Sequence, residues 1–399
     1  MHENRITIFS NFFWPEGGGA DVATRAVAKT LLRERFRVVA VSGTAAPCYD
    51  GLRGLRYFHW PLFEQKPKPL EWVSLFANAG AIKKFIEQSD IVYIPSHSLI
   101  PLAIIARRVK PNAKIIIHLH GYQPISYSAA VLPNSPKTNA DQVMFELRDH
   151  NSVLRAVATG LLIPVNEINV LALMHADKII FVSRRQMEII TGRLPWVRNK
   201  AAVVPNMMED THYAQKNYSS TPTLLYAGGS SFLKGFRLVL QAGLTLSKNE
   251  PCPRIVVTNY LSDQAKKLID ELNRKRRTFE ALGRIDHKQL LEILTKAWSL
   301  LFPSLWEEPW GYAVMEAMLS GTIPIASRVG GTPELVEGTA AENYLFEPGN
   351  ADEFVERIES VLTLSRENAF DIGQMIREQT LRKFNSETSK NVLLEALTN

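Results

Sequence analysis

Short runs of apolar residues alternate along the chain with longer stretches in which apolar positions recur every three or four residues. In the first half, the short runs predict strands that are buried on both faces of a parallel sheet. These runs are Ile6–Ser10, Val38–Val41, Ile91–Ile94, Ile115–His118, Ile179–Val182 and Ala202–Val204. The helical spacing predicts helices between them, including Ala20–Arg35, Glu71–Glu87 and Leu99–Arg107.

The same alternation returns after a polar, non-periodic stretch from Asn206 to Pro222, which reads as a linker between domains. The strands predicted beyond it are Leu224–Ala227, Arg254–Thr258, Leu300–Phe302, Ile323–Ala326 and Tyr344–Phe346. Two helices, around Glu367–Arg382 and Glu387–Leu397, are predicted to follow them.

Strands and helices that alternate on both sides of a linker predict an α/β protein with two Rossmann-like, doubly wound parallel sheets. Such sheets bind ligands beyond the carboxyl ends of their strands, where the strand order reverses. We therefore expect two domains that face each other across a cleft, with functional residues placed directly after strands.

The composition narrows the class of protein. Of the 399 residues, 46% are hydrophobic and 22% are charged, which excludes collagen-like and wholly disordered chains. Two cysteines, Cys48 and Cys252, are too few for a disulfide framework. The net charge of +6 favours anions without indicating a nucleic-acid partner. The polar start and the lack of an apolar run near 20 residues predict a cytoplasmic protein without a membrane-spanning helix.

The segment Pro303–Glu316 carries the most specific chemistry, because it leaves a predicted strand, crosses a short loop and opens a helix. Glu308 precedes Pro309, which favours extended loop backbone at that carboxylate. The backbone N–H groups from Gly311 to Val314 would form an anion site at the helix start. Glu316 is placed to reach a neutral hydroxyl group. This arrangement fits a diphosphate flanked by two carboxylates, although spacing alone fits two solvated glutamates equally well.

Three other segments also follow predicted strands. Tyr226–Gly235 contains a glycine turn followed by Lys234. This lysine could stabilise the oxyanion that forms as a leaving group departs, or it could be an ordinary surface lysine. Trp14–Ala20 contains three successive glycines, which suit an anion or a flexible turn, and its spacing excludes the dinucleotide fingerprint. His118 and His120 end a strand, where a histidine is often structural.

Glu308 and Glu316, eight positions apart, resemble the paired-glutamate motif of the retaining glycosyltransferases of family four, which have the GT-B fold. Further segments match that family in the same order along nearly the whole chain. They are the glycine loop 17–19, Asp177–Ser183, Val203–Asn206, Lys234–Gly235, Gly321–Ser327 and Gly330–Glu334.

The resemblance implies an acceptor-binding domain over residues 1–205, joined by a C-terminal helix over 385–399, and a donor-binding domain over 206–384. It also implies a hexosyltransferase that moves a sugar from a nucleoside-diphosphate-sugar donor to an acceptor hydroxyl with retention of configuration. The acceptor would be a glycan, a lipid-linked molecule or a small molecule, as in polysaccharide or glycolipid biosynthesis.

The resemblance also assigns roles to residues. Glu308 would contact the donor sugar, Glu316 the ribose and Lys234 the donor phosphate. His120 would lie near the reaction centre, so His120, Lys234 and Glu308 are the catalytic candidates, with His97 and His120 on the acceptor side. The other donor-binding candidates are Gly17, Gly18, Gly19, Gly229, Arg237, Arg284, Trp310, Gly311, Tyr312, Ala313 and Val314.

Two departures from common patterns affect the predicted chemistry. The family usually has an arginine five residues before the lysine, where this chain has Gly229; Arg237 is a candidate substitute. No Asp-x-Asp sequence occurs, so the usual carboxylate clamp for a divalent ion is missing. We expect activity without a metal or other cofactor.

Several alternatives stay open. A sugar-nucleotide 2-epimerase shares the architecture but needs acid and base groups around the sugar, and Gly229 would also fit an inactive sugar-nucleotide binder. Arg56–Phe63 mixes aromatic and basic residues, which suits peripheral contact with the inner face of a membrane or ordinary packing. Leu161–Leu173 could border an acceptor groove or pack on the sheet.

Overall fold

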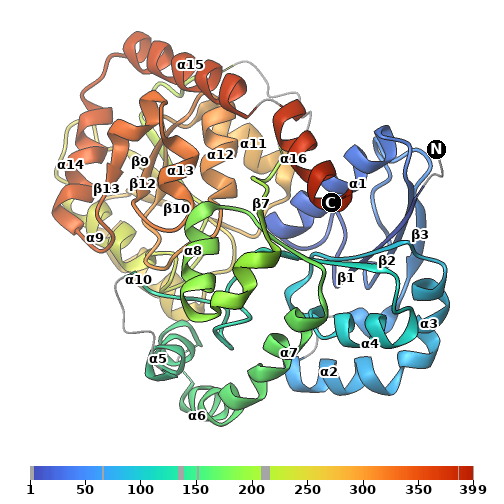
Figure 1. The fold of residues 1–399 in the computed structure, drawn as a ribbon. Coiled ribbons are helices and arrows are strands. Elements are labelled where there is room, and N and C mark those ends of the chain that lie inside the picture. Colours follow the sequence, from blue (N-terminus) through green and yellow to red (C-terminus); the bar gives the residue numbers. More distant parts are fainter. Residues whose placement is uncertain are drawn as a thin grey trace. The chain divides into compact units, whose positions relative to one another are not determined.

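The fold is taken from a computed structural model, which describes residues 4–64, 67–133, 139–150, 152–207, 216–384 and 386–398. The chain forms two compact units (Figure 1). Unit 1 comprises residues 1–130, 161–210 and 385–399, and unit 2 comprises residues 131–160 and 211–384.

Unit 1 contains a parallel sheet of seven strands in the order β3-β2-β1-β4-β5-β6-β7. The strands are β1 (Arg5–Ser10), β2 (Arg37–Ser42), β3 (Arg56–His59), β4 (Ile91–Ile94), β5 (Lys114–Leu119), β6 (Lys178–Phe181) and β7 (Ala201–Val203). The helices are α1 (Gly19–Arg33), α2 (Lys68–Ala77), α3 (Ala79–Glu87), α4 (Leu102–Val109), α7 (Glu167–His175), α8 (Arg184–Arg193) and α16 (Ser386–Thr398). The strand order reverses between β1 and β4, which marks this sheet edge as the expected ligand position.

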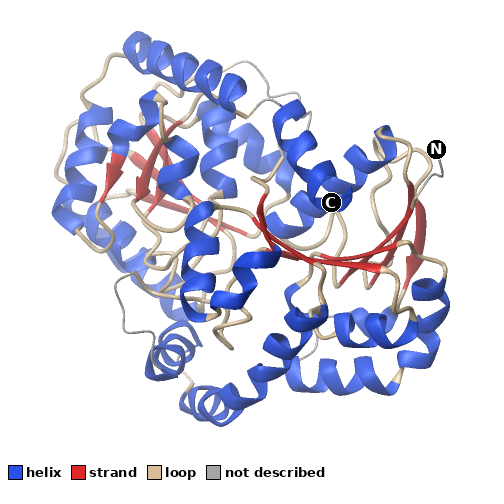
Figure 2. Ribbon diagram, in the orientation of Figure 1, coloured by secondary structure: helices blue, strands red, loops and turns tan. Residues whose placement is uncertain are grey.

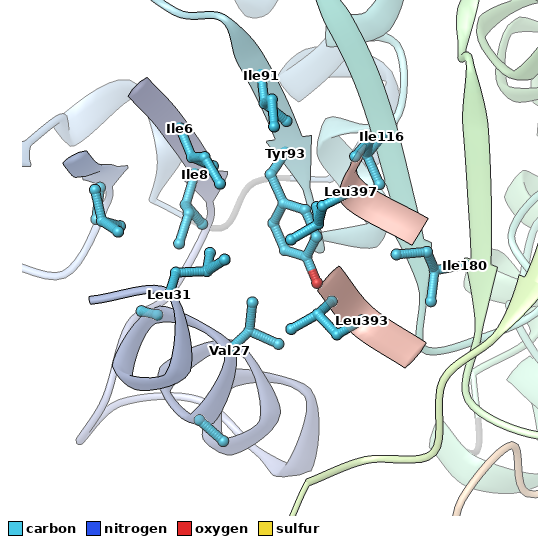
Figure 3. Close-up of a cluster of buried hydrophobic side chains, with 14 of the residues drawn as sticks. Ile6, Ile8, Val27, Leu31, Ile91, Tyr93, Ile116, Ile180, Leu393 and Leu397 are labelled. Atoms are coloured by element: carbon cyan, nitrogen blue, oxygen red, sulfur yellow. The ribbon is translucent and has the colours of Figure 1, made fainter. Parts of the chain in front are cut away.

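The core of unit 1 includes side chains from the last helix of the chain. Leu393 and Leu397 of α16 pack with Ile6, Ile8 and Tyr93 of the sheet (Figure 3). Lys390 of the same helix pairs with Glu34 at the end of α1, at 3.1 Å. The hydrophobic core beside the N-terminal sheet is therefore completed by a helix that is far away in sequence.

Unit 2 contains a second parallel sheet, whose strands are drawn in red in Figure 2. Its strand order is β10-β9-β8-β11-β12-β13. Its strands are β8 (Thr223–Tyr226), β9 (Arg254–Thr258), β10 (Phe279–Gly283), β11 (Ser299–Phe302), β12 (Ile323–Ser327) and β13 (Leu345–Phe346). The helices that follow β8 are α9 (Phe236–Leu246), α10 (Asp263–Lys275), α11 (His287–Lys296), α12 (Tyr312–Leu319), α13 (Thr332–Val336), α14 (Ala351–Leu362) and α15 (Arg366–Lys383). The strand order reverses between β8 and β11.

Residues 131–160 belong to unit 2, whereas the sequence placed them in the first domain. This segment contains α5 (Asn139–His150) and most of α6 (Val153–Leu162). The Asp149 carboxylate accepts hydrogen bonds from the backbone N–H of Phe232 and the hydroxyl of Ser231, and the N–H of Glu307 donates to the carbonyl of Val131. These bonds to the loops after β8 and β11 fix the segment on the second unit.

The described end of the predicted linker is packed rather than loose. Lys216 is buried, and its ammonium donates to the carbonyls of Leu294 and Ala297 and to the hydroxyl of Thr322. The buried Tyr218 hydroxyl donates to the carbonyl of Gly321. Residues 208–215 of the predicted linker lie outside the described residues, and those from 216 onward are part of unit 2.

Candidate functional site

The reversal point of the second sheet gathers the loops that the sequence singled out. β8 and β11 are parallel neighbours, so their carboxyl ends lie at the same sheet edge. The loop after β8 carries Gly229 and Lys234, and the loop after β11 carries Glu308 and leads into α12. Topology therefore places these three residues at one edge of unit 2.

Lys234 and Glu308 form an ion pair at this edge, in which the lysine ammonium donates to Oε2 of the glutamate. The glutamate side chain is 13% exposed and the lysine side chain 35% exposed. The ammonium also lies 5.4 Å from the centre of the Trp306 ring. The sequence predicted separate contacts for these two groups with a sugar and a phosphate, and here they bind each other.

Glycines from the following loop hold the backbone of Glu308. The N–H of Gly331 donates to the Glu308 carbonyl at 2.9 Å, and the N–H of Gly330 donates to the buried carboxylate of Glu307 at 2.7 Å. Gly330 has φ +52°, and a Cβ there would lie 1.9 Å from the Glu308 carbonyl oxygen. Glu307 was missed by sequence reasoning, since nothing in the pattern separates a structural glutamate from its functional neighbour.

The start of α12 provides fewer free amides than the sequence predicted. Gly311 is the N-cap residue, and because it has no side chain it cannot cap the N–H groups of the first turn. The N–H of Tyr312 already donates to the carbonyl of Trp310 at 2.9 Å, so this group is not free as predicted. Ala313 and Val314 occupy the remaining first-turn positions, where helix N–H groups point out of the helix and attract anions.

Glu316 is buried on α12 and bonded to a residue that the sequence did not identify. Its Oε1 lies 2.6 Å from Nε2 of His287, the first residue of α11. The preceding Asp286 caps α11 and thereby fixes the backbone at His287. His287 is thus placed to orient the Glu316 carboxylate; a lone histidine at a helix start gave no signal for this.

The position of the missing family arginine is closed by the backbone. Gly229 has φ +60°, and its N–H donates to the Thr258 carbonyl at 3.0 Å. A Cβ at Gly229 would lie 2.3 Å from the carbonyl oxygen of Tyr260. No L side chain fits there without movement of the loop after β9, so the glycine is a requirement of this backbone.

The other predicted donor-binding side chains differ in their surroundings. Trp310 is buried and packs edge-to-face on Phe384 at 5.6 Å between ring centres, which indicates a packing role. Arg237 is exposed on α9. Arg284 is exposed beside the edge strand β10, in the wall of a cavity that it shares with Arg254. For both arginines, contact with a donor stays a prediction.

The glycine loop of unit 1 already holds a carboxylate. The N–H of Gly18 donates to Oδ2 of Asp21 at 2.8 Å, and Gly17, with φ +92°, leaves room for that carboxylate. Burial raises the pKa of Asp21 to about 6. Gly19 begins α1. An anion predicted at this loop therefore has to compete with the side chain of Asp21.

His118 and His120 lie together at the carboxyl end of β5, where His118 is buried and His120 half-buried, whereas His97 is exposed in the loop after β4. Nδ1 of His118 lies 2.5 Å from the Tyr93 hydroxyl, and the rings of His118 and His120 lie 4.3 Å apart between centres. Burial, reinforced by the neighbouring His97, lowers the pKa of His120 to about 3. His120 is therefore uncharged at neutral pH.

A polar cavity lies where the strand order of unit 1 reverses. Its walls come from the loops after β1 and β4 and from α1 and α2, and they include Asp21, Lys68, Glu71 and His97. Glu71 is buried and accepts a hydrogen bond from the Ser98 hydroxyl at 2.9 Å. The sequence identified only His97 of these, because Glu71 lies on a predicted helix and Lys68 just before it, not directly after a predicted strand.

Two family models match the chain. The model described as Glycosyltransferase Family 4 matches residues 17–211, and the model described as Glycosyl transferases group 1 matches residues 208–379. A phosphatidylinositol N-acetylglucosaminyltransferase subunit of Arabidopsis thaliana is 23% identical over 367 residues, which cover 90% of this chain and 74% of that protein. The human protein of the same name is 24% identical over 349 residues, covering 84% and 64% respectively.

Solved structures show the same fold. HepE of Anabaena, solved in complex with UDP and glucose, has a TM-score of 0.69 at 17% identity, covering 99% of this chain and 100% of that chain. Sucrose-phosphate synthase of Thermosynechococcus elongatus has a TM-score of 0.74 at 17% identity, covering 99% and 98%. The fold predicted from the sequence is confirmed, and the chain belongs to the family-four glycosyltransferases of the GT-B fold.

Proposed function

We propose that unit 2 binds a nucleoside-diphosphate sugar and that the chain transfers this sugar to an acceptor hydroxyl. The observation that carries the proposal is the Lys234–Glu308 ion pair beside the start of α12. The relatives' names support it, since two are N-acetylglucosaminyltransferase subunits and HepE is complexed with UDP and glucose.

In the proposed mechanism, the donor diphosphate draws the Lys234 ammonium away from Glu308. The lysine and the first-turn amides of α12 then stabilise the charge that develops on the leaving diphosphate. The freed Glu308 carboxylate accepts a hydrogen bond from a hydroxyl of the donor sugar. We propose that these groups supply the charge neutralisation, so that no divalent cation is needed.

The proposed transfer breaks the bond between the anomeric carbon and the phosphate oxygen, and the electron pair leaves with the diphosphate. A new bond forms between the anomeric carbon and the acceptor oxygen, whose proton passes to a phosphate oxygen. Attack from the same face of the sugar that the diphosphate leaves accounts for retention, which we propose from the family resemblance. The polar cavity with His97 and Glu71 in unit 1 is the proposed position of acceptor hydroxyl groups.

We expect a nucleoside diphosphate and its sugar conjugate to bind the protein in the presence of EDTA. At about 100 times Kd, a ligand that binds only the folded protein stabilises it by about 2.7 kcal/mol, which a thermal-unfolding screen of nucleotides detects. The matching nucleosides, which lack the diphosphate, serve as the control. The proposal fails if no nucleotide binds, and its metal-free form fails if binding appears only with added magnesium. The anomer formed, identified by NMR, tests retention.

His287→Ala is expected to raise the KM for the donor about tenfold, with a smaller change in kcat. A hydrogen bond to a charged group contributes about 1.5–3 kcal/mol, and without it the Glu316 carboxylate loses its orientation. His287→Gln, which keeps a donor, is the matched control and should recover part of the affinity. Equal donor affinity in all three proteins would show that His287 has no positioning role.

A further inference from the structure

The helical stretch Val153–His175 presents apolar side chains to solvent. It comprises α6, a 3-10 turn at Ile163–Asn166, and α7 (Figure 1). Leu161 is 75% exposed, Leu171 54% and Met174 60%. The large exposed hydrophobic residues of the part of this stretch that belongs to unit 1 are Leu161, Val165, Leu171 and Met174. Such a concentration marks an interaction surface.

Of the buried residues of the same stretch, all except Leu173 are small or polar. Asn166 donates to the carbonyl of Gln123 at 2.7 Å, and Asn169 donates to the side-chain oxygen of Asn166 at 3.0 Å. Ala172 and Leu173 are fully buried. A helix that only packs on a sheet has its large apolar residues inward, so the reversed pattern needs a partner on the outward side.

By length and composition this stretch could cross a membrane, contrary to the sequence expectation. It is 23 residues long, and the mean hydropathy of its most apolar part is 1.6, with 28% of that part buried. Among the described residues, no other helix is both long enough and apolar enough to cross a membrane. However, its inward Asn166 is bonded to the carbonyl of Gln123 in unit 1, and Pro164 lies in the 3-10 turn. These features favour a helix that lies on a surface rather than one that spans a bilayer.

Cations surround the carboxyl end of α7. The Lys200 ammonium donates to the carbonyls of Met174 and Ala176, at 2.9 and 2.6 Å, and lies 6.0 Å from the centre of the Trp196 ring. Arg107 donates to the carbonyl of His175 at 3.0 Å, and the exposed Arg108 contributes to the charge there. Basic side chains and an exposed tryptophan beside an apolar face are typical of contact with anionic lipid headgroups.

We propose that the exposed apolar face of residues 161–175 in unit 1, which comprise the end of α6, the 3-10 turn and α7, binds the surface of an anionic lipid bilayer. The apolar side chains enter the boundary between headgroups and acyl chains, and Arg108 and Lys200 lie at the level of the headgroup phosphates. The aromatic segment Arg56–Phe63, the other candidate from the sequence, is instead largely used in packing. Phe58 and Trp60 both contact Phe85, and Phe63 is buried.

The test is co-sedimentation of the full chain with vesicles of phosphatidylcholine alone or mixed with phosphatidylglycerol. We expect binding to the mixed vesicles that weakens with added salt. The triple variant L161S/L171S/M174S should bind about tenfold more weakly or worse, because the apolar contact is removed. Arg108→Gln should lower the affinity for the anionic vesicles about fivefold.

The controls replace exposed residues that lie outside this face. L268S/L381S replaces exposed leucines on α10 and α15, and Lys248→Gln replaces an exposed cation after α9; both should bind like the wild type. Circular dichroism checks that each variant is folded. The proposal is overturned if the wild type binds neither vesicle, or if the triple variant binds equally well. A wild-type dimer that the triple variant abolishes would instead assign this face to a second copy of the chain.

Discussion

Lys234→Ala is expected to lower kcat by about 100-fold or more, because one preorganised contact to developing charge contributes at this level. The structure predicts a second effect, weaker donor binding: without the ammonium, the mostly buried Glu308 carboxylate would repel an incoming diphosphate. The rate is measured as release of nucleoside diphosphate at saturating donor and acceptor.

Two further variants separate these effects. Lys234→Ala combined with Glu308→Gln removes the repulsion and should recover donor affinity but not turnover. Lys248→Ala, on an exposed lysine after α9, is the control for loss of surface charge and should be unaffected. A rate for Lys234→Ala within about threefold of the wild type would remove our site assignment. A wild type that binds the donor without turnover would fit the inactive binder.

Gly229→Arg, which restores the usual family residue, is expected to weaken donor binding at least tenfold instead of strengthening it. A left-handed conformation costs a non-glycine residue about 1–3 kcal/mol, and the new Cβ would collide with the Tyr260 carbonyl. The loop that carries Lys234 would then have to move. Calorimetric titration with the donor and thermal unfolding measure the two effects.

Gly338→Arg is the matched control, because Gly338 has a similar φ of +73° but nothing lies within 4 Å of the position that a Cβ would take there. It should lose stability from the backbone strain alone and keep its donor affinity. Tighter donor binding by Gly229→Arg than by the wild type would contradict this prediction. It would show that the loop after β9 can move aside, and that the backbone does not require a glycine at position 229.

Interior strands were predictable from sequence, while the edge strands β3 and β10 were not. Ile91–Ile94 and Arg254–Thr258 were predicted with the observed bounds, since strands buried on both faces are continuous apolar runs. β3 and β10 are edge strands with several exposed residues, so their sequences lack such a run. The predicted helix Glu71–Glu87 is two helices, α2 and α3, that meet at Asn78.

For the site, the sequence predicted the location but not the contacts. The rule that ligands bind after strands led to Lys234, Glu308 and His97, and topology places each of them at a reversal point. The pairing of Lys234 with Glu308 and the bond from Gly18 to Asp21 depend on loop geometry. No periodicity encodes such geometry, because loops are shaped by contacts between segments distant in sequence.

The packing of α16 on the first sheet also constrains how the protein is made on the ribosome. Synthesis proceeds from the N-terminus, so the strands of unit 1 emerge well before Leu393 and Leu397, which complete their core. Until then, the apolar surface around Ile6 and Ile8 lacks part of its cover. The nascent first unit must therefore wait for the whole of unit 2 to be translated before it reaches its final packing, a period in which a chaperone would find an exposed surface to bind.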